Sequence, residues 1–361
     1  MSGLMERMLK TKAKGVDSFS AEKSSLLRVP QDLFVPTSLP AFNIALSGDV
    51  TKGFGPGVNI LAGESGTGKT LLSWIAARAF QKKNPEGLIL FYDSEQGTPE
   101  DYLVSLDIDI TRVMHVPVMN IEELKFDMVK KLNSIEKDDK VFILIDSLGN
   151  IASVKELDDA ENEKSVGDMS RAKAMKSFFR MVTPIISNKR VYLFGIQHTY
   201  QEIGMFPKTI VGGGTGSVYA SNSILLLTKA QDKEGKELVG IKINMNIYKS
   251  RQVREKQRIG LTLKFDSGFD TFAGLLELFV ELSVVIKPNL QRYCIVDSDG
   301  VLDESVSYYR KDIEKGDIIM GILRRKDVQE RIKNRFQLSG NGKQTIKNEF
   351  DVSFLDEPTD K

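Results

Sequence analysis

The stretch Gly63-Glu64-Ser65-Gly66-Thr67-Gly68-Lys69-Thr70 decides the fold of this chain, because it matches the phosphate-binding pattern G-x-x-x-x-G-K-[ST] at every position. It follows an apolar run at 58–61 and opens a segment with helical periodicity, which is the context that the pattern requires. The glycines let the backbone wrap around phosphates, and the helix N-terminus adds a positive dipole end. We therefore expect a site for ATP, with Lys69 at the β- and γ-phosphates and the Thr70 hydroxyl on Mg²⁺.

Two acidic positions would complete this site. An apolar run at 141–145 ends at Asp146, and a strand of this kind delivers its carboxylate to the sheet edge where ligands bind. Asp146 would hold Mg²⁺, through water, although buried strands also end in Asp as a turn residue. Hydrolysis needs a group that orients or deprotonates the attacking water. Glu95, just past the run at 88–92, is the best candidate, with Asp93 as its competitor and a solvated loop carboxylate as the alternative.

Composition narrows the class of protein. The 361 residues carry 50 basic and 49 acidic side chains, so binding to a polyanion must come from local patches. The single cysteine, Cys294, excludes an intrachain disulfide and fits a reducing cytosol. No apolar run approaches the roughly 20 residues that span a bilayer, and the N-terminus lacks the apolar core of a secretory signal. We expect a cytoplasmic protein without membrane association.

Strand and helix patterns alternate between 58 and 230, which predicts an α/β fold with a doubly wound, mainly parallel sheet. The expected strands are 58–61, 88–92, 113–116, 141–145, 191–196 and 224–227, and the expected helices are 69–82, 99–106, 121–135 and 168–183. A polar turn at 231–237 separates this region from strands at 238–249 and 260–265, which would extend the sheet in antiparallel fashion.

The two ends of the chain read differently. Residues 1–29 predict a short helix whose apolar face, with Leu4, Met5, Met8 and Leu9, packs on its own domain or docks on a neighbouring subunit. Residues 271–361 predict a small C-terminal domain of mixed structure. It contains a basic, helix-rich stretch at 321–337, and its last dozen residues are expected to be loosely ordered.

Taken together, the motifs resemble those of the RecA-type recombinases, and most of all the tailed-phage branch typified by UvsX. The segments that carry the resemblance, over about 30–335, are LPAFNIALSG (39–48), LFYDSEQGTPEDYL (90–103), FILIDSLGN (142–150), the run 168–180, GIQHTYQ (195–201), VGGGTGSVYAS (211–221) and YKSRQVREK (248–256). The resemblance implies a P-loop RecA-like ATPase core at 30–270, an N-terminal oligomerisation segment at 1–29 and a small C-terminal α/β domain at 271–361.

For the nucleotide, the resemblance implies that Glu95 activates water and that Tyr102 stacks on adenine. Gln197 and His198 would sense the γ-phosphate and relay its presence to the DNA-binding loops, with His198 where bacterial members carry Gln. Lys249 and Arg251 would cross the subunit interface to the neighbour's ATP, in the manner of an arginine finger. The alternative for the last pair is a solvated or polyanion-binding cluster, because Arg254, Lys256 and Arg258 follow closely.

For DNA, two segments are expected to face the filament axis. The first is an acidic loop at about 153–168 followed by a basic helix, where the resemblance places Lys173, Lys176 and Arg180 on the DNA backbone; an exposed charged face is the alternative. The second, about 199–218, has no regular pattern. There Ile203 matches the residue that wedges between base triplets, and backbone N–H groups around Gly212, Gly213 and Gly214 would take phosphates.

The function implied is a DNA-dependent ATPase that forms ATP·Mg²⁺-bound helical filaments on single-stranded DNA and exchanges its strand with a homologous duplex. Such a protein serves recombination, repair and recombination-dependent replication, in the host cytoplasm if a phage encodes it, with single-strand-binding and mediator proteins as further partners. The basic helices of the C-terminal domain would gate duplex DNA, or their charged side chains would only form a solvent-exposed surface. Two other classes stay open: a ring-forming helicase motor built on the same core, and an ATP-switched recombination mediator.

Overall fold

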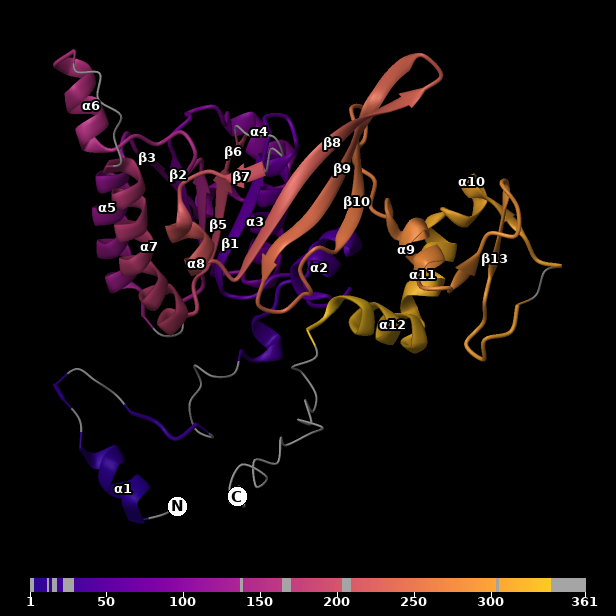
Figure 1. The fold of residues 1–361 in the computed structure, drawn as a ribbon, viewed down its shortest axis with the longest axis horizontal. Helices are drawn as coiled ribbons and strands as arrows, with labels where there is room; N and C mark the ends of the chain where they lie inside the picture. Colours follow the sequence, from indigo (N-terminus) through magenta and orange to yellow (C-terminus); the bar gives the residue numbers. More distant parts are fainter. Residues whose placement is uncertain are drawn as a thin grey trace, which may run out of the picture.

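A large twisted sheet forms the centre of the fold (Figure 1). The computed structural model describes residues 3–11, 13–14, 18–21, 29–136, 139–163, 170–202, 209–302 and 305–338. Within these residues, the strands of the central sheet lie in the order β11-β10-β9-β8-β1-β5-β4-β2-β3. Neighbours from β8 to β3 are parallel, and β8 to β11 pair in antiparallel fashion. This order confirms the predicted parallel sheet and its antiparallel extension.

The parallel strands begin and end close to the apolar runs that predicted them, except β8, which continues well past its run at 224–227. They are β1 (Gly57–Gly63), β2 (Leu88–Asp93), β3 (Val113–Pro117), β4 (Val141–Asp146), β5 (Tyr192–Gln197) and β8 (Ser223–Glu234). Every residue of β1, β4 and β5 is buried, because these strands lie inside the sheet and helices cover both of its faces. The strand β3 is the edge, and its residues are half-buried or exposed.

Two hydrophobic cores lie on the two faces of the sheet. Helices α2 (Pro40–Ser47) and α3 (Lys69–Lys83) pack on one face, and α5 (Ile121–Ser134) and α7 (Ser170–Lys189) pack on the other. Side chains of β4 alternate between them: Phe142 enters the first core and Ile143 the second. The short helix α4 (Glu100–Ser105) follows β2.

The antiparallel part is a long hairpin that projects beyond the parallel strands (Figure 1). It consists of β8 and β9 (Glu237–Ser250), with β10 (Arg258–Lys264) and β11 (Gly268–Phe269) beside them. The polar turn expected over 231–237 is therefore too long, since β8 continues to Glu234 and the chain reverses at Gly235 with φ 63°. Polar residues remain in strand conformation here because cross-strand ion pairs support them, as where Asp232 meets Lys242 at 3.2 Å.

Residues 275–336 combine short helices with a small sheet. The elements are α9 (Leu275–Glu281), β12 (Val285–Ile286), β13 (Arg292–Ile295), β14 (Tyr308–Tyr309), α10 (Arg310–Ile313), α11 (Gly316–Arg324) and α12 (Lys326–Phe336). Their apolar side chains continue the core that α2 and α3 cover, and α12 contacts α2. The domain boundary at 271 stays a prediction, because one core runs across it. The last dozen residues lie outside the described part.

The first segment predicted to face DNA is not the loop that the sequence predicted. Residues Val154–Glu161 form the helix α6. Ser153 begins it with a capping box, in which its hydroxyl accepts from the Glu156 N–H and the Glu156 carboxylate accepts from the Ser153 N–H. The pattern S-x-x-E was the missed signal.

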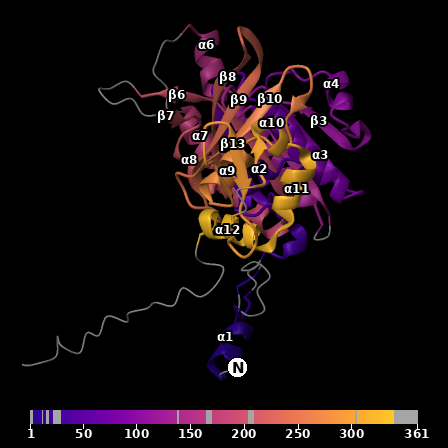
Figure 2. The same cartoon turned by 90° about the vertical axis from the view of Figure 1, so that its right-hand side faces the viewer.

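The second segment is also more regular than predicted. Strands β6 (Thr199–Gln201) and β7 (Thr209–Val211) pair in antiparallel fashion, and α8 (Thr215–Ala220) follows them. Figure 2 shows β6 and β7 at the outer edge of the molecule. Ile203 lies outside the described residues. In the preceding helix α7, the chain stays helical through Pro184 to Lys189 rather than ending at 183.

The N-terminal helix α1 (Gly3–Lys10) stands apart from the core in both views (Figures 1 and 2). Leu4, Met5 and Met8 are 58%, 43% and 64% exposed, so these three side chains lie on the surface of the described part of the chain. Among the described residues, no helix is both long and apolar enough to cross a membrane.

Candidate nucleotide site

The predicted nucleotide residues meet at the carboxyl ends of β1, β2, β4 and β5. A cavity of about 440 Å³ opens there, lined by Ser65, Gly66, Gly68, Lys69, Thr70, Leu71, Glu95, Tyr102, Asp146, Ile196, His198, Ile241, Leu263 and Phe265. This is the edge at which open parallel sheets bind ligands, because loops diverge where each strand hands over to a helix. The cavity thus collects predicted residues from four separate motifs.

The phosphate-binding loop has the backbone conformation that its glycines predict. Gly66 and Gly68 have φ of 71° and 81°, a region that other residues rarely adopt, and Gly68 directly precedes α3. The Lys69 side chain is buried, and its Nζ donates to the carbonyls of Gly63 at 2.9 Å and Glu64 at 2.7 Å. Burial lowers the pKa of Lys69, against the opposing charges of Asp146 and Glu95. The ammonium is therefore fixed at the mouth of the loop, beside the N-terminus of α3.

A lysine that the sequence analysis missed also holds this loop. Lys229 on β8 donates from Nζ to the Ser65 carbonyl at 2.7 Å. In a trans peptide the C=O and the following N–H point in opposite directions, so a carbonyl held from outside turns the Gly66 N–H away from Lys229. No local motif marks Lys229, because only the pairing of β8 with β1 brings it to the loop.

Thr70 and Asp146 form the candidate Mg²⁺ site. The Thr70 hydroxyl donates to the Asp146 carboxylate at 2.9 Å, and both residues line the cavity. Burial raises the pKa of Asp146 to about 6, with a further rise from the charges of Glu95 and Asp93. A hydroxyl and a carboxylate are hard oxygen donors of the kind that Mg²⁺ prefers when phosphates and waters supply the rest of its shell. The donor set fits the predicted ion.

Glu95 and Asp93 have different environments, and this separates the two acids that the sequence left in competition. Glu95 reaches the cavity, where its Oε1 accepts from Ser147 Oγ and Asn150 Nδ2, both at 2.8 Å, and lies 3.5 Å from His198 Nε2. Asp93 is buried away from the cavity.

The Asp93 carboxylate instead holds the loop that carries Glu95. Its Oδ1 accepts the N–H groups of Glu95 at 3.0 Å and Gln96 at 2.6 Å, and its Oδ2 lies 3.1 Å from His115 Nε2. The His115 ring stacks on Phe91, with ring centroids 5.3 Å apart. Gln96 has a φ of 52°, an uncommon value that this carboxylate supports. Asp93 therefore shapes the loop, and Glu95 faces the site.

Two aromatic side chains line the same cavity. Tyr102 lies on α4, and burial together with the charge of Asp146 raises its pKa. Phe265 follows β10 and is 62% exposed, which is unusual for a large apolar side chain beside a polar cavity. The sequence analysis predicted Tyr102 and missed Phe265, together with Ile241 and Leu263 of the hairpin strands. The signal that could have identified Phe265 was its position, as an aromatic residue, at the end of the predicted strand 260–265.

Gln197 and His198 end on opposite sides of the β5 terminus. His198 lines the cavity and lies near Glu95, whereas Gln197 is fully buried and does not line it. The Gln197 amide faces α8, where Ser217 Oγ lies 3.5 Å from Gln197 Oε1 and a Cβ on Gly213 would stand 2.6 Å from Nε2. Within the described residues, Nε2 has no hydrogen-bond partner. The structure thus brings one of the predicted pair to the cavity and directs the other toward the segment of Gly213 and Ser217.

Lys249 and Arg251 lie outside the cavity of their own subunit. Lys249 Nζ donates to backbone carbonyls at the end of α8. Arg251 is exposed, and its guanidinium makes no hydrogen bond or ion pair within the described part of the chain. Of the two, Arg251 is the cation available to another molecule in this conformation.

The predicted DNA residues lie on α7 and at the start of α8. Lys173, Lys176 and Arg180 are exposed on one face of α7. A Cβ on Gly216 would stand 2.8 Å from the Lys176 Cα, so this glycine lets α8 lie against α7. The Gly212 N–H donates to the His198 carbonyl at 2.9 Å, so it does not point outward to a phosphate as predicted. Gly213 and Gly214 have φ of 80° and 73°.

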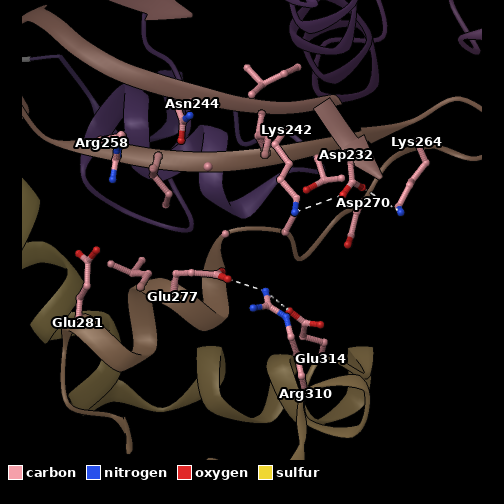
Figure 3. A pocket seen from close by; sticks show the side chains of 18 residues that line it. Asp232, Lys242, Asn244, Arg258, Lys264, Asp270, Glu277, Glu281, Arg310 and Glu314 are labelled. Carbon is pink, nitrogen blue, oxygen red and sulfur yellow. Dashed lines mark hydrogen bonds and ion pairs between the residues drawn. The ribbon is translucent and has the colours of Figure 1, made fainter. Parts of the chain in front are cut away.

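A second, larger cleft of about 570 Å³ lies between the hairpin strands and helices α9 and α10 (Figure 3). Five of its charged side chains pair with one another: Lys264 meets Asp232 at 2.9 Å, and Arg310 bridges Glu277 and Glu314. None of the residues predicted for the nucleotide lines it. Internal pairing of this kind indicates a polar contact between two parts of the fold, so the smaller cavity is the candidate site.

Comparison with known proteins agrees with this arrangement. A family model described as the RecA N-terminal domain matches residues 31–270, a range that contains every residue lining the smaller cavity. The recombination and repair protein of Enterobacteria phage T4 is 38% identical over 342 residues, covering 94% of this chain and 87% of the phage protein. Protein RecA of Acholeplasma laidlawii (strain PG-8A) is 26% identical over 263 residues, covering 69% of this chain and 75% of that protein. Protein RecA of Thermus aquaticus is 26% identical over 263 residues, with coverage of 70% and 73%.

Proposed function

The chain belongs to the RecA family of recombination and repair proteins, and on that premise we propose that it is a DNA-dependent ATPase that assembles on single-stranded DNA and exchanges strands. The observation that carries this proposal is the cavity at the strand ends, where the phosphate-binding loop, the oxygen atoms of Thr70 and Asp146 and the carboxylate of Glu95 converge. A nucleotide switch without hydrolysis would not need the last of these groups.

In the proposed site, Lys69 binds the β- and γ-phosphates, and Thr70 and Asp146 hold Mg²⁺, which neutralises phosphate charge. Glu95 orients the attacking water, because its second carboxylate oxygen has no partner among the described residues while Ser147 and Asn150 fix the first. His198 senses the γ-phosphate from the same wall of the cavity. Tyr102 and Phe265 offer flat apolar faces to the adenine ring.

The proposed polymer forms when subunits stack with the nucleotide between them. The exposed apolar face of α1, with Leu4, Met5 and Met8, would dock on the adjoining subunit, because an isolated helix this short needs a surface to stabilise it. Arg251 would reach across to the neighbour's γ-phosphate, and Lys249 would join it after leaving α8. A cation supplied in this way stimulates hydrolysis only in assembled subunits.

The proposed DNA surface is the face of α7 with Lys173, Lys176 and Arg180, together with the segment before α8. Lysine and arginine contacts to phosphates give affinity without sequence preference, so base pairing with the incoming duplex supplies the specificity. Gly213, Gly214 and Ile203 keep the roles that the resemblance implies, as predictions. We propose that this exchange takes place in the cytoplasm of a bacterial host, with single-strand-binding and mediator proteins as partners.

One pair of assays tests the function. ATP hydrolysis is measured with and without single-stranded DNA, and strand exchange is measured between circular single-stranded and linear duplex DNA, for the wild type, Lys69→Ala and Glu95→Gln. We expect DNA to stimulate hydrolysis, and both variants to lose it. Rings in electron micrographs would instead indicate a helicase motor. Hydrolysis without DNA stimulation would indicate a nucleotide-switched mediator.

A further inference from the structure

The ammonium of Lys249 lies at the C-terminal end of α8. Lys249 is on β9, and its Nζ donates to the carbonyls of Val218, Ser221 at 3.0 Å and Tyr219 at 3.4 Å. The helix α8 ends at Ala220, so these carbonyls belong to its last turn and to its C-cap residue, Ser221. Few of the last carbonyls of a helix have partners inside it, and three of them here share a single cation.

This contact is favourable for two physical reasons. The carbonyl end of a helix carries the negative end of its dipole, so a cation stabilises it. Lys249 is also partly buried, and burial followed by the charge of Arg251 lowers its pKa. A desolvated ammonium needs acceptors in place of water, and the α8 carbonyls provide them. The contact therefore satisfies the helix end and the lysine together.

The other contacts of α8 lead to the two predicted binding surfaces. At its N-terminal end, Ser217 Oγ lies 3.5 Å from the Gln197 amide and donates to the Gly214 carbonyl at 3.1 Å. On its side, Gly216 lies against the backbone of α7 at Lys176. The helix α8 thus connects the end of β5, next to the nucleotide cavity, with the helix proposed to bind DNA.

We propose that Lys249 is a positioning residue within its own subunit, where it holds the C-terminal end of α8 and so fixes the segment of Gly213 and Gly214 over Gln197. Only the role of α8 in a DNA response rests on the proposed function; the positioning itself is a property of the isolated subunit. Arg251, two residues further on, does not contact α8 through its side chain and serves as a matched control.

Hydrogen exchange of the full chain tests this, at a concentration below assembly and without nucleotide or DNA. In Lys249→Met, we expect amides in 209–221 to exchange about tenfold faster than in the wild type, because one charged hydrogen-bond donor is lost. Arg251→Met should leave this exchange unchanged. Lys249→Arg should restore most of the protection, because a guanidinium also donates to carbonyls. Melting temperatures of all variants establish that each is folded.

Unchanged exchange of 209–221 in folded Lys249→Met would overturn the proposal, and so would equal effects of Lys249→Met and Arg251→Met. If Lys249→Met fails to fold, Lys249→Ala, which also removes the donor, takes its place with the same two criteria. Failure of the proposed function has a different readout, since it would appear as wild-type protein that binds no DNA while α8 remains protected.

Discussion

The hydroxyl of Thr70 and the carboxylate of Asp146, 76 positions apart in the chain, meet at 2.9 Å where α3 begins and β4 ends. Each residue comes from a separate motif, and only the packing of β1, β5 and β4 side by side brings them together. The pair defines where a divalent cation would sit. Without that ion, the effect of the buried Asp146 carboxylate on the stability of the fold can be measured.

Asp146→Asn should change how stability depends on pH. Burial raises the folded pKa of Asp146 from 3.8 to about 6, so the folded state binds a proton more readily than the unfolded state between those values. Stability contributed by this group therefore falls as pH rises through that window, by about 3 kcal/mol in all. Without nucleotide, Asp146→Asn should unfold at higher temperature than the wild type at pH 7 and at nearly the same temperature below pH 4. A gap that does not vary with pH would contradict this.

Glu95→Gln should bind nucleotide normally and lose hydrolysis. Glutamine keeps an oxygen for Ser147 and Asn150 but cannot orient or deprotonate water as a carboxylate does, so kcat should fall by about 10²-fold or more. Filaments on single-stranded DNA should then outlast those of the wild type, as measured by dissociation after dilution. Glu86→Gln, at an exposed position outside the cavity, is the control. Comparable losses in both variants would exclude a special role for Glu95.

Asp93→Ala should lower kcat without lowering nucleotide affinity. The change removes the acceptor for the Glu95 and Gln96 N–H groups and leaves His115 without its partner, so the loop loses its fixed position. We expect a fall in kcat of about tenfold, the size of one lost hydrogen bond to a charged group. Equilibrium dialysis of labelled ATP measures the affinity separately. A weaker Kd with unchanged kcat would show that the loop serves binding instead.

Phe265→Ala should weaken ATP binding and leave kcat almost unchanged. Stacking of a base on an aromatic ring is worth about 1–3 kcal/mol, so KM should rise by about tenfold or more. Phe126 is 57% exposed on α5 and does not line the cavity, which makes Phe126→Ala the matched control. The adenine contact would be established if inorganic triphosphate bound equally well to Phe265→Ala and Phe126→Ala while ATP bound more weakly to Phe265→Ala. Equal KM values for ATP in the two variants would exclude this contact.

Met8→Glu should weaken assembly and leave the monomer unaffected. The side chain is 64% exposed on α1, so the folded subunit loses no packing, whereas a charge in a subunit contact is costly. Light scattering on single-stranded DNA with ATP should show a higher concentration for assembly. Met119 is equally exposed at 64%, and Met119→Glu should leave assembly unchanged. Unaltered assembly in both variants would place α1 outside the interface.

The sequence predicted those features whose pattern lies within one short segment of the chain. The glycine and lysine spacing at 63–70 predicted the loop, and apolar runs predicted the buried strands β1, β4 and β5, because burial on both faces demands continuous hydrophobicity. Lys229 and Phe265 could not be found in this way, since only the pairing of strands distant in the chain brings Lys229 to the phosphate loop and Phe265 to the cavity. The helix α6 was missed although Ser153 and Glu156 signalled its start, because the segment was expected to form an acidic loop facing the filament axis.

Gln197 and His198 are neighbours in the chain, yet they serve opposite faces of the sheet because successive side chains of a strand point in opposite directions. The two side chains are therefore coupled through the single peptide that joins them at the end of β5. A rotation at the end of β5 that moves the His198 imidazole toward Glu95 would also move the Gln197 amide relative to Gly213. If His198 senses the γ-phosphate as proposed, rotation of this one peptide would couple the nucleotide cavity to the segment of Gly213.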